Sequence, residues 1–408
     1  MNDSLLVRNA LLLDPGTGEY REGDLRCAEG RIVETGPGLR APGVRTVDAD
    51  GAVVLPGLID AHVHVTAFTA NLGSLPESSP SYVAAHSARI MRGMLARGFT
   101  TVRDASGADY GLADAQAEGL FPGPRLLFCG RALSQTGGHG DTRGRGTHRQ
   151  DDHPCCAGLG RIADGVDAVR AAARDELRKG AHHIKVMASG GVASPTDRID
   201  STQYSAEEIR AVVEEAGAAN RYVAAHAYTA RAVNRALELG IRSIEHGNLL
   251  DDRSVELFRE HDAFLVPTLV TYWALKQEGR EYGLPESSWR KVDEVLGAGL
   301  AALDRAARGG VKLVFGTDLL GGMHRHQNHE FRLRAEVQPP LEVIRSATSV
   351  AAELVGMTGE AGTLAPGAHA DLLVVDGDPL ADIGVLAEPK HLRHVIQAGR
   401  IVGGHGTP

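Results

Sequence analysis

Apolar and polar positions in the body of the chain follow two alternating patterns. Short runs rich in Val, Ile, Leu and Ala are separated by longer stretches whose apolar residues recur with a helical period. The short runs predict buried strands, and the longer stretches predict amphipathic helices. Eight runs are strand candidates: 58–64, 100–104, 125–130, 183–188, 222–226, 243–247, 263–268 and 312–318.

Helical patterns separate most of these runs, for example at 82–97, 167–180, 205–220 and 229–240. Ser205 with Glu208 three residues later predicts a capping box, and Gly180 and Gly240 predict helix ends. Strands that alternate with helices pair in parallel, and eight such repeats favour a closed (β/α)8 barrel in an α/β fold. An open, doubly wound sheet is the alternative, but no Gly-rich phosphate loop follows the first run.

The two ends of the chain carry a different pattern. Residues 1–56 contain short β-like pieces separated by turns, and the same pattern returns in residues 362–408, for example at 370–375 and 394–402. We therefore predict that the two ends pair into one small β-domain. Residues 57–361 between them would form the barrel.

The bulk composition narrows the classes of function. The 408 residues are enough for a barrel-sized core and a smaller appendage. A net charge of -9 argues against nucleic acid or an anionic membrane as the main partner. No secretory signal pattern opens the chain, and no apolar run approaches the roughly 20 residues that span a bilayer. We therefore expect a soluble cytoplasmic protein.

Four cysteines in so long a chain do not predict a disulfide framework. Cys155 and Cys156 are adjacent in a loop rich in Gly, His and Arg, and we interpret them as solvent-facing thiols, with metal ligands or a redox pair as alternatives. The surrounding stretch 137–160 is long, Gly-rich and without periodicity. It is therefore a candidate lid.

The first run carries two histidines, His62 and His64, separated by one residue. On a strand these side chains point to the same face, so both imidazoles can reach one metal ion. Four further polar groups lie in later runs: Lys185, His226, His246 and Asp318. Because barrel enzymes place their sites at the carboxyl ends of the strands, the six groups are expected to converge. Each of these residues taken alone more often has a structural role. Their occurrence at successive predicted strands, however, favours a binding site for Zn²⁺ or a similar metal.

Lys185 does not suit a metal site as an ammonium, because its positive charge would repel a cation. Burial near a metal would lower the pKa of this amine and leave it uncharged. Addition of CO₂ to the free amine gives a carbamate, an anionic ligand whose two oxygens can bridge two cations.

These segments resemble the amidohydrolase superfamily over nearly the whole chain. Residues 57–64 (Gly-Leu-Ile-Asp-Ala-His-Val-His) are similar to its metal-binding signature, and 183–191 (His-Ile-Lys-Val-Met-Ala-Ser-Gly-Gly) to its strand with a carboxylated lysine. The chain is most similar to the branch of Xaa-Pro dipeptidases and related amide hydrolases, alongside imidazolonepropionase-like proteins. Further matching segments are 136–140, 226–228, 243–247 and 316–318.

The resemblance implies two divalent metal ions, with Zn²⁺ favoured, although Mn²⁺ and Co²⁺ accept the same ligand types. The implied ligands are His62, His64 and Asp318 for one ion, His226 and His246 for the other, and Lys185, as its CO₂-derived carbamate, between them. The resemblance also implies that the terminal segments 1–56 and 362–408 form a β-sandwich.

Further residues are candidates for catalysis and substrate binding. Asp318 is expected to take a proton from the metal-bound water and pass it to the leaving nitrogen. By resemblance, Tyr228 donates to the oxyanion or holds a substrate carboxylate, although simple packing explains it equally well. His139 is implied as a substrate-facing catalytic residue. Arg103 could bind a substrate carboxylate or pair with an acid of the barrel, and His326 is expected to border the pocket.

We therefore predict a binuclear metal hydrolase that cleaves an amide bond through a metal-bound hydroxide. The expected substrate is a small molecule such as an Xaa-Pro dipeptide or an N-acyl amino acid. Esters, lactones, carbamates or cyclic amides would suit the same metal site, and a mononuclear deaminase and a non-catalytic relative are further alternatives. A homo-oligomer is compatible with the resemblance, but no interface can be identified from the sequence.

Overall fold

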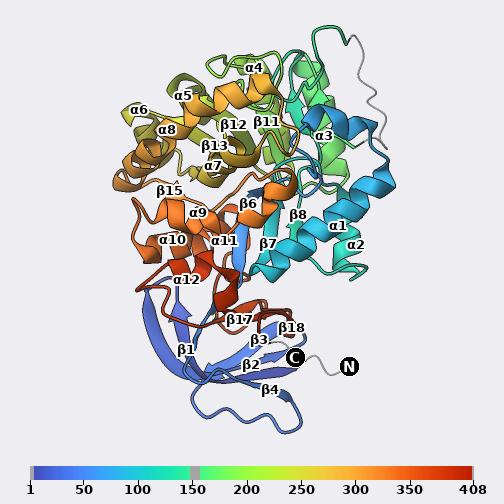
Figure 1. Ribbon diagram of the computed structural model, residues 1–408. Coiled ribbons are helices and arrows are strands. Elements are labelled where there is room, and N and C mark those ends of the chain that lie inside the picture. The colour runs from blue at the N-terminus through green and yellow to red at the C-terminus, as the bar shows by residue number, and fades with distance from the viewer. Residues whose placement is uncertain (1–3, 148–156, 407–408) are drawn as a thin grey trace.

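The computed structural model describes residues 4–147 and 157–406. All eight predicted runs contain strands, labelled in part in Figure 1. Their bounds are β6 (Leu58–Val63), β7 (Phe99–Asp104), β8 (Arg125–Leu127), β11 (Ile184–Met187), β12 (Val223–Thr229), β13 (Ser243–Leu249), β14 (Phe264–Val266) and β15 (Lys312–Leu313). Two short strands that we did not predict, β9 (Ala132–Ser134) and β10 (Gly160–Ile162), lie between β8 and β11 in the sequence.

These strands form two parallel sheets. One has the order β6-β7-β8, and the other has the order β10-β9-β11-β12-β13-β14-β15. Backbone hydrogen bonds also run between the two sheets: the His182 amide donates to the Phe128 carbonyl at 2.8 Å, and the Ala61 amide donates to the Phe315 carbonyl at 2.9 Å. The fold is therefore α/β with parallel strands, and the first and last of the eight predicted strand segments lie side by side.

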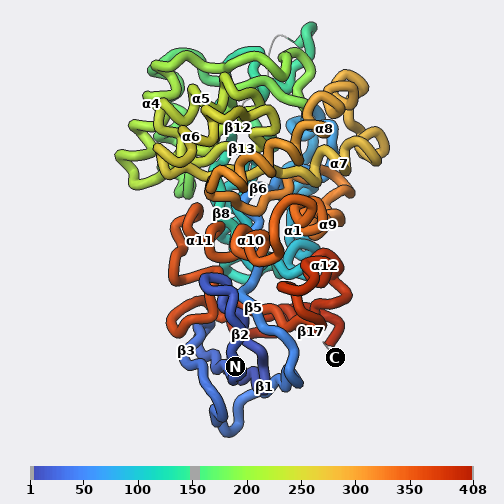
Figure 2. Tube along the Cα trace, turned by 90° about the vertical axis from the view of Figure 1, so that its left-hand side faces the viewer, coloured from blue at the N-terminus to red at the C-terminus, as the bar shows by residue number. Residues whose placement is uncertain are grey.

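Helices connect and cover these strands (Figures 1 and 2). Their bounds are α1 (Pro80–Ala96), α2 (Tyr110–Ala117), α3 (Val166–Arg178), α4 (Ala206–Ala218), α5 (Ala230–Glu238), α6 (Asp252–Glu260), α7 (Leu269–Glu278), α8 (Glu286–Arg308), α9 (His329–Arg334), α10 (Pro340–Ser346), α11 (Ser349–Leu354) and α12 (Gly384–Ala387). The 3-10 helices are η1 (Leu72–Glu77), η2 (Gly321–His326) and η3 (Pro389–His391).

The predicted helix signals are confirmed. Ser205 and Glu208 form the capping box of α4, in which each side chain bonds the backbone amide of the other residue. Gly180 and Gly240 follow α3 and α5 with φ of +94° and +91°, a conformation that favours glycine. In the part of the chain that the structure describes, no helix is long and apolar enough to cross a membrane.

The two ends of the chain share one curved sheet, which we call the terminal sheet. Its order is β18-β17-β16-β5-β1-β2-β3, with β4 also paired to β1. The strands are β1 (Leu5–Asp14), β2 (Glu19–Ala28), β3 (Arg31–Gly36), β4 (Arg45–Asp48), β5 (Val53–Pro56), β16 (Leu372–Val375), β17 (Leu392–Gln397) and β18 (Arg400–Gly403). The segment 394–402 is split into β17 and β18 by a turn at Ala398 and Gly399, both with positive φ. The pairing of the two ends is as predicted.

Alternate residues of the terminal sheet point to two different cores, as the period of a strand requires. In β16, Leu373 and Val375 pack with apolar residues of α1 and α10, whereas Leu372 and Val374 pack within the terminal sheet. All four are completely buried. The terminal sheet is thus attached to the parallel strands by one apolar face and holds a second core of its own.

Candidate active site

One cavity lies at the carboxyl ends of the parallel strands, and all six predicted metal ligands line it: His62, His64, Lys185, His226, His246 and Asp318. The cavity and its open mouth together enclose about 670 Å³, which includes space open to solvent. The remaining lining includes apolar side chains of Leu72, Leu159, Met187, Val192, Leu275 and Leu320.

The backbone around the cavity adopts an unusual conformation at several positions. His246, Thr268 and Asp318 have φ of +77°, +49° and +53°, values that residues with a side chain rarely adopt. Such strain clusters at functional sites, where the surrounding structure holds it in place. The Asp318 amide donates to the His62 carbonyl at 2.8 Å, which fixes Asp318 beside the end of β6.

Asp318 is the centre of the polar cluster. Its Oδ1 lies 3.4 Å from Nε2 of His62 and 3.0 Å from Nε2 of His64, and its Oδ2 lies 4.0 Å from Nδ1 of His246. Burial alone would raise the pKa of Asp318, but the histidines outweigh burial and hold the pKa well below its usual range. The ligand atoms of His62, His246 and Asp318 lie within 4.8 Å of one another, so these three could hold one metal ion.

Each predicted histidine ligand has one ring nitrogen bound to an oxygen behind it. Nδ1 of His62 lies 2.6 Å from Oε2 of Glu245, and Nδ1 of His64 lies 2.9 Å from the Ser106 carbonyl. Nδ1 of His246 lies 2.8 Å from Oγ1 of Thr268, and Nε2 of His226 lies 3.1 Å from the Gly190 carbonyl. Metal-binding histidines are usually held in this way, with the other nitrogen left for the ion. The donor set therefore fits a metal centre.

Lys185 lies in the wall of the same cavity and is 2% exposed. Burial lowers the pKa of its ammonium, and the neighbouring Arg103 guanidinium lowers it further, against the opposing effect of Glu245. Among the described residues, none forms a hydrogen bond or ion pair with the Lys185 amine. This environment favours the free amine that carbamate formation requires.

Tyr228 and His139 also line the cavity. The Tyr228 hydroxyl lies 3.0 Å from the Tyr272 hydroxyl, and burial raises the pKa of Tyr228 so that it stays protonated. The His139 ring stacks on His226 with the ring centres 4.1 Å apart. Burial lowers the pKa of His139, which favours the neutral ring. Both side chains can therefore contact a molecule bound beside the histidine cluster.

The family can be identified from the whole chain. The model of the amidohydrolase family matches residues 53–402. The chain belongs to this family. Among curated relatives, ochratoxinase from Aspergillus niger is 35% identical over 367 residues, which cover 87% of this chain and 76% of the relative. The enzyme is therefore a hydrolase that acts on amide bonds, in a family that generally uses divalent metals.

Solved structures agree with this assignment. A prolidase complexed with N-methylphosphonate-L-proline is 50% identical, with a TM-score of 0.95 over 98% of this chain and 99% of that chain. A Xaa-Pro dipeptidase with bound methionine in its active site is 28% identical, with a TM-score of 0.87 over 98% of this chain and 99% of that chain. The amidohydrolase thus resembles this prolidase and this Xaa-Pro dipeptidase over 98% of its chain.

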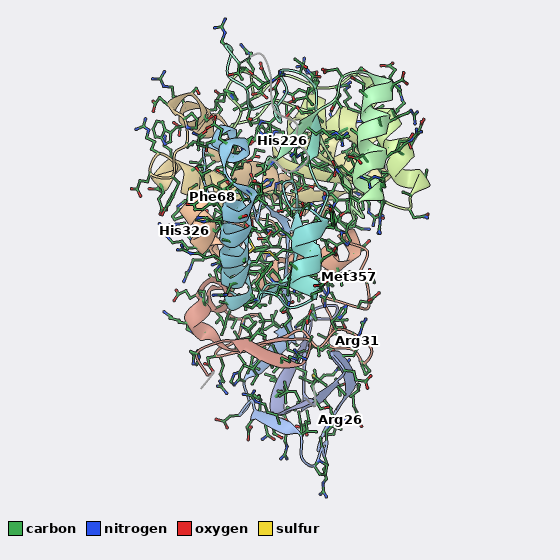
Figure 3. All side chains as sticks on the ribbon, turned by 90° about the vertical axis from the view of Figure 1, so that its right-hand side faces the viewer. Arg26, Arg31, Phe68, His226, His326 and Met357 are labelled. Carbon is green, nitrogen blue, oxygen red and sulfur yellow. The ribbon has the colours of Figure 1, made fainter. Side chains whose placement is uncertain are left out.

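Two predicted substrate residues of the amidohydrolase do not reach the cavity. Arg103 is 1% exposed, and its Nη2 lies 2.8 and 2.9 Å from the two carboxylate oxygens of Glu245. The prediction that it binds a substrate carboxylate is wrong, and the alternative, a pair with a barrel acid, is correct. His326 is also absent from the lining formed by the described residues, because its Nε2 binds Glu278 at 2.9 Å. His226 and His326 lie apart in Figure 3.

Sequence reasoning missed Glu245, which joins His62 to Arg103. A signal was present, since a charged residue in the middle of the buried run 243–247 needs a partner. The interpretation of Cys155 and Cys156 concerns residues outside the described part of the chain, as does the middle of the candidate lid. The described ends of that stretch contribute five residues to the cavity wall: His139, Gly140, Thr142, Leu159 and Gly160.

Proposed function

We propose that the enzyme is a binuclear metal-dependent hydrolase that cleaves the amide bond of an Xaa-Pro dipeptide or an N-acyl amino acid. The observation that carries this proposal is the presence of four histidines, one lysine and one aspartate in the wall of a single cavity. We further propose that the two parallel sheets form a closed (β/α)8 barrel over residues 57–361. Residues 1–56 and 362–408 would then form its β-sandwich domain.

His62, His64 and Asp318 would hold one divalent ion, and His226 and His246 the other; His246, whose ligand atom also lies within 4.8 Å of those of His62 and Asp318, would then border both ions. When bound, the two ions, with Zn²⁺ as our first choice, would acidify a shared water and polarise the substrate carbonyl. Lys185, as a carbamate, would offer one oxygen to each site. Its burial and lowered pKa support this assignment, because only the uncharged amine adds CO₂.

Asp318 would act as the proton carrier of the reaction. Its carboxylate lies beside His62 and His64 and has a strongly lowered pKa, so it is ionised and able to accept a proton. The same group can then deliver that proton to the leaving nitrogen. The protonated Tyr228 hydroxyl, held by Tyr272, would donate to the oxyanion or to a substrate carboxylate.

The cavity wall and one relative support a proline-containing or N-acyl substrate. Apolar side chains such as Met187, Val192 and Leu320 line the cavity beside the polar cluster and would contact the apolar part of a substrate. The prolidase relative was solved with N-methylphosphonate-L-proline. In that compound a tetrahedral phosphorus replaces the carbonyl carbon that is attacked during cleavage of an Xaa-Pro bond.

Metal analysis combined with a substrate panel tests this proposal. We expect two metal equivalents per chain after loading with Zn²⁺, and turnover of at least one Xaa-Pro dipeptide or N-acyl amino acid. Lys185→Ala should bind one metal equivalent or fewer, and its kcat/KM should fall by more than about 100-fold. Removing a residue that only supports a metal ligand costs at most about 100-fold, so a larger loss indicates a ligand. Lys390→Ala, at a largely exposed position, is the matched control and should behave as wild type.

Two results would contradict the proposal. Full activity and unchanged metal content in Lys185→Ala would remove the bridging role. A single metal equivalent together with ammonia release from an amino-substituted ring would instead indicate a mononuclear deaminase.

A further inference from the structure

A segment beyond β11, residues 189–203, forms part of the cavity wall, and α8 holds it from outside. Val192 and Ala193 of this segment line the cavity. Nζ of Lys291, on α8, donates to the carbonyls of Gly191, Ser194 and Asp197 at 3.0, 3.0 and 2.8 Å. One ammonium thus binds three backbone carbonyls of the segment that lies next to the site.

The Asp197 carboxylate organises the inner side of this segment. It accepts hydrogen bonds from the Gly191 amide at 3.2 Å and from Nε2 of Gln203 at 3.0 Å, and Nζ of Lys291 lies 3.5 Å away. Its fourth partner is the Ser194 hydroxyl. The Asp197 side chain is only 3% exposed. The Asp197 carboxylate accepts from the N–H and N⁺–H donors around it. The Ser194 hydroxyl, which also lies 3.2 Å from the Gly191 carbonyl, therefore donates its single proton to the shorter and more strongly accepting contact, Asp197.

Two of the four partners of Asp197, Ser194 and Gln203, also contact His139. Oγ of Ser194 lies 2.8 Å from Nδ1 of the His139 ring, and Oε1 of Gln203 accepts a hydrogen bond from the His139 backbone amide at 2.8 Å. Gly191 leaves the space that the ring occupies, since a Cβ at that position would lie 2.2 Å from Cε1 of His139. The ring is therefore fixed through its side chain, its backbone and its packing.

The hydrogen-bond directions also select one tautomer. Because the Ser194 proton goes to Asp197, Ser194 has no proton left to donate to His139. The contact between the two residues is therefore a hydrogen bond in which Nδ1–H of His139 donates to the Ser194 oxygen. A neutral His139 ring then carries its proton on Nδ1. The other nitrogen, Nε2, is left as a hydrogen-bond acceptor.

We propose that Asp197 and Ser194 are positioning residues that hold His139 in the Nδ1–H tautomer and present its Nε2 as an acceptor for an N–H or ammonium group of the substrate. This inference rests on the proposed function, because it places the substrate in the cavity beside His139. It assigns a role to a segment that contributes no predicted metal ligand.

A double-mutant cycle on the metal-loaded full-length enzyme tests the proposal. Ser194→Ala should lower kcat/KM by about 10- to 100-fold, the cost of a misplaced catalytic group, with two metal equivalents retained. Ser194→Thr keeps the hydroxyl and should recover most of the activity. In a His139→Ala background, Ser194→Ala should have no further effect, because Ser194 acts through His139. Penalties that add in the double variant would overturn the proposal.

Nitrogen NMR of ¹⁵N-histidine-labelled enzyme gives a readout that needs no turnover. The His139 signals, assigned by their loss in His139→Ala, should show a proton on Nδ1 in the wild type and a mixture of tautomers in Ser194→Ala. A proton on Nε2 in the wild type would overturn the inference. If no substrate of the panel is cleaved, the proposed function fails, whereas the tautomer measurement still decides this inference by itself. Asp197→Asn, if it folds, should reproduce the Ser194→Ala spectrum.

Discussion

The cavity and the terminal sheet bury their residues in opposite ways. Around the cavity the buried side chains include a cluster of histidines, carboxylates and a lysine beside apolar residues, and His246 and Asp318 lie on strained backbone. The buried side chains between the strands of the terminal sheet are nearly all apolar, including Leu5, Val7 and Leu372. Buried charges are costly even when they are paired, whereas buried apolar area stabilises. The comparison predicts that substitutions at the cavity change chemistry, and that substitutions in the terminal sheet change stability.

Among the substitutions that test this comparison, we expect the largest change in metal affinity and stability at Glu245. Glu245→Gln removes the carboxylate behind His62 and leaves the buried Arg103 charge unpaired. Metal affinity should fall by about 10- to 100-fold, and the free energy of unfolding by about 3 to 5 kcal/mol. Competition with a chelator measures the first quantity, and urea unfolding measures the second.

A second variant separates the two effects of Glu245. Replacing both partners, with Arg103→Met and Glu245→Gln together, removes the unpaired charge and should restore most of the stability but none of the metal affinity. Recovery of metal binding in the double variant would show that Glu245 acts only through folding.

Leu372→Ala tests the other side of the comparison. This side chain is fully buried in the core of the terminal sheet. Its truncation should lower the free energy of unfolding by about 2 to 5 kcal/mol and leave the metal content and kcat of the folded enzyme unchanged. A parallel loss of metal affinity would break the comparison, because the terminal sheet would then influence the cavity directly.

Glu330 on α9 is a buried titratable group outside the cavity lining. Burial raises its pKa to about 8, against an ordinary value of 4.5, so the folded enzyme prefers the protonated form. The protonated Glu330 side chain therefore contributes to the free energy of unfolding in full below pH 4.5, and this contribution is lost as the pH rises through 8. In Glu330→Gln this part of the pH dependence should disappear, because the amide does not titrate in this range. Thermal unfolding at several pH values checks the sign; an unchanged slope would contradict it.

The smallest effect is expected at the start of α4. Ser205→Ala removes one half of the capping box with Glu208 and should cost about 1 kcal/mol without changing kcat. Ser205→Asp retains a capping oxygen and serves as the control in the same melting experiment. A loss of activity in Ser205→Ala would mean that α4 contributes to the site.

Local patterns predicted most of the fold, because the period of a strand or helix is written in neighbouring residues. The eight predicted strand runs and the helix-capping signals could be recognised from such local periods and residue types. The three-residue strands β9 and β10 are too short to show a period. The turn at Ala398 was missed because alanine rarely adopts a positive φ.

Within the candidate site, the meeting of the six predicted ligands in one cavity could be expected because each lies on a predicted strand or just beyond its end. Their supports could not be predicted. Arg103 and Glu245 are separated by 142 positions, and their pairing depends on two strands meeting across the interior. Ser194, Asp197 and Lys291 likewise meet only in three dimensions. A sequence displays the residue types of a site more readily than the contacts that orient them.

The sharing of one sheet by both ends has a consequence for how the protein is made. Strand β5 bonds β16 through pairs such as Val53 with Val375, more than three hundred positions later. At about 5 to 20 residues per second, a ribosome needs tens of seconds to deliver that partner. During this interval one edge of β5 is open to other nascent chains, a known route to aggregation. The sheet that emerges first during synthesis is therefore the last to be completed.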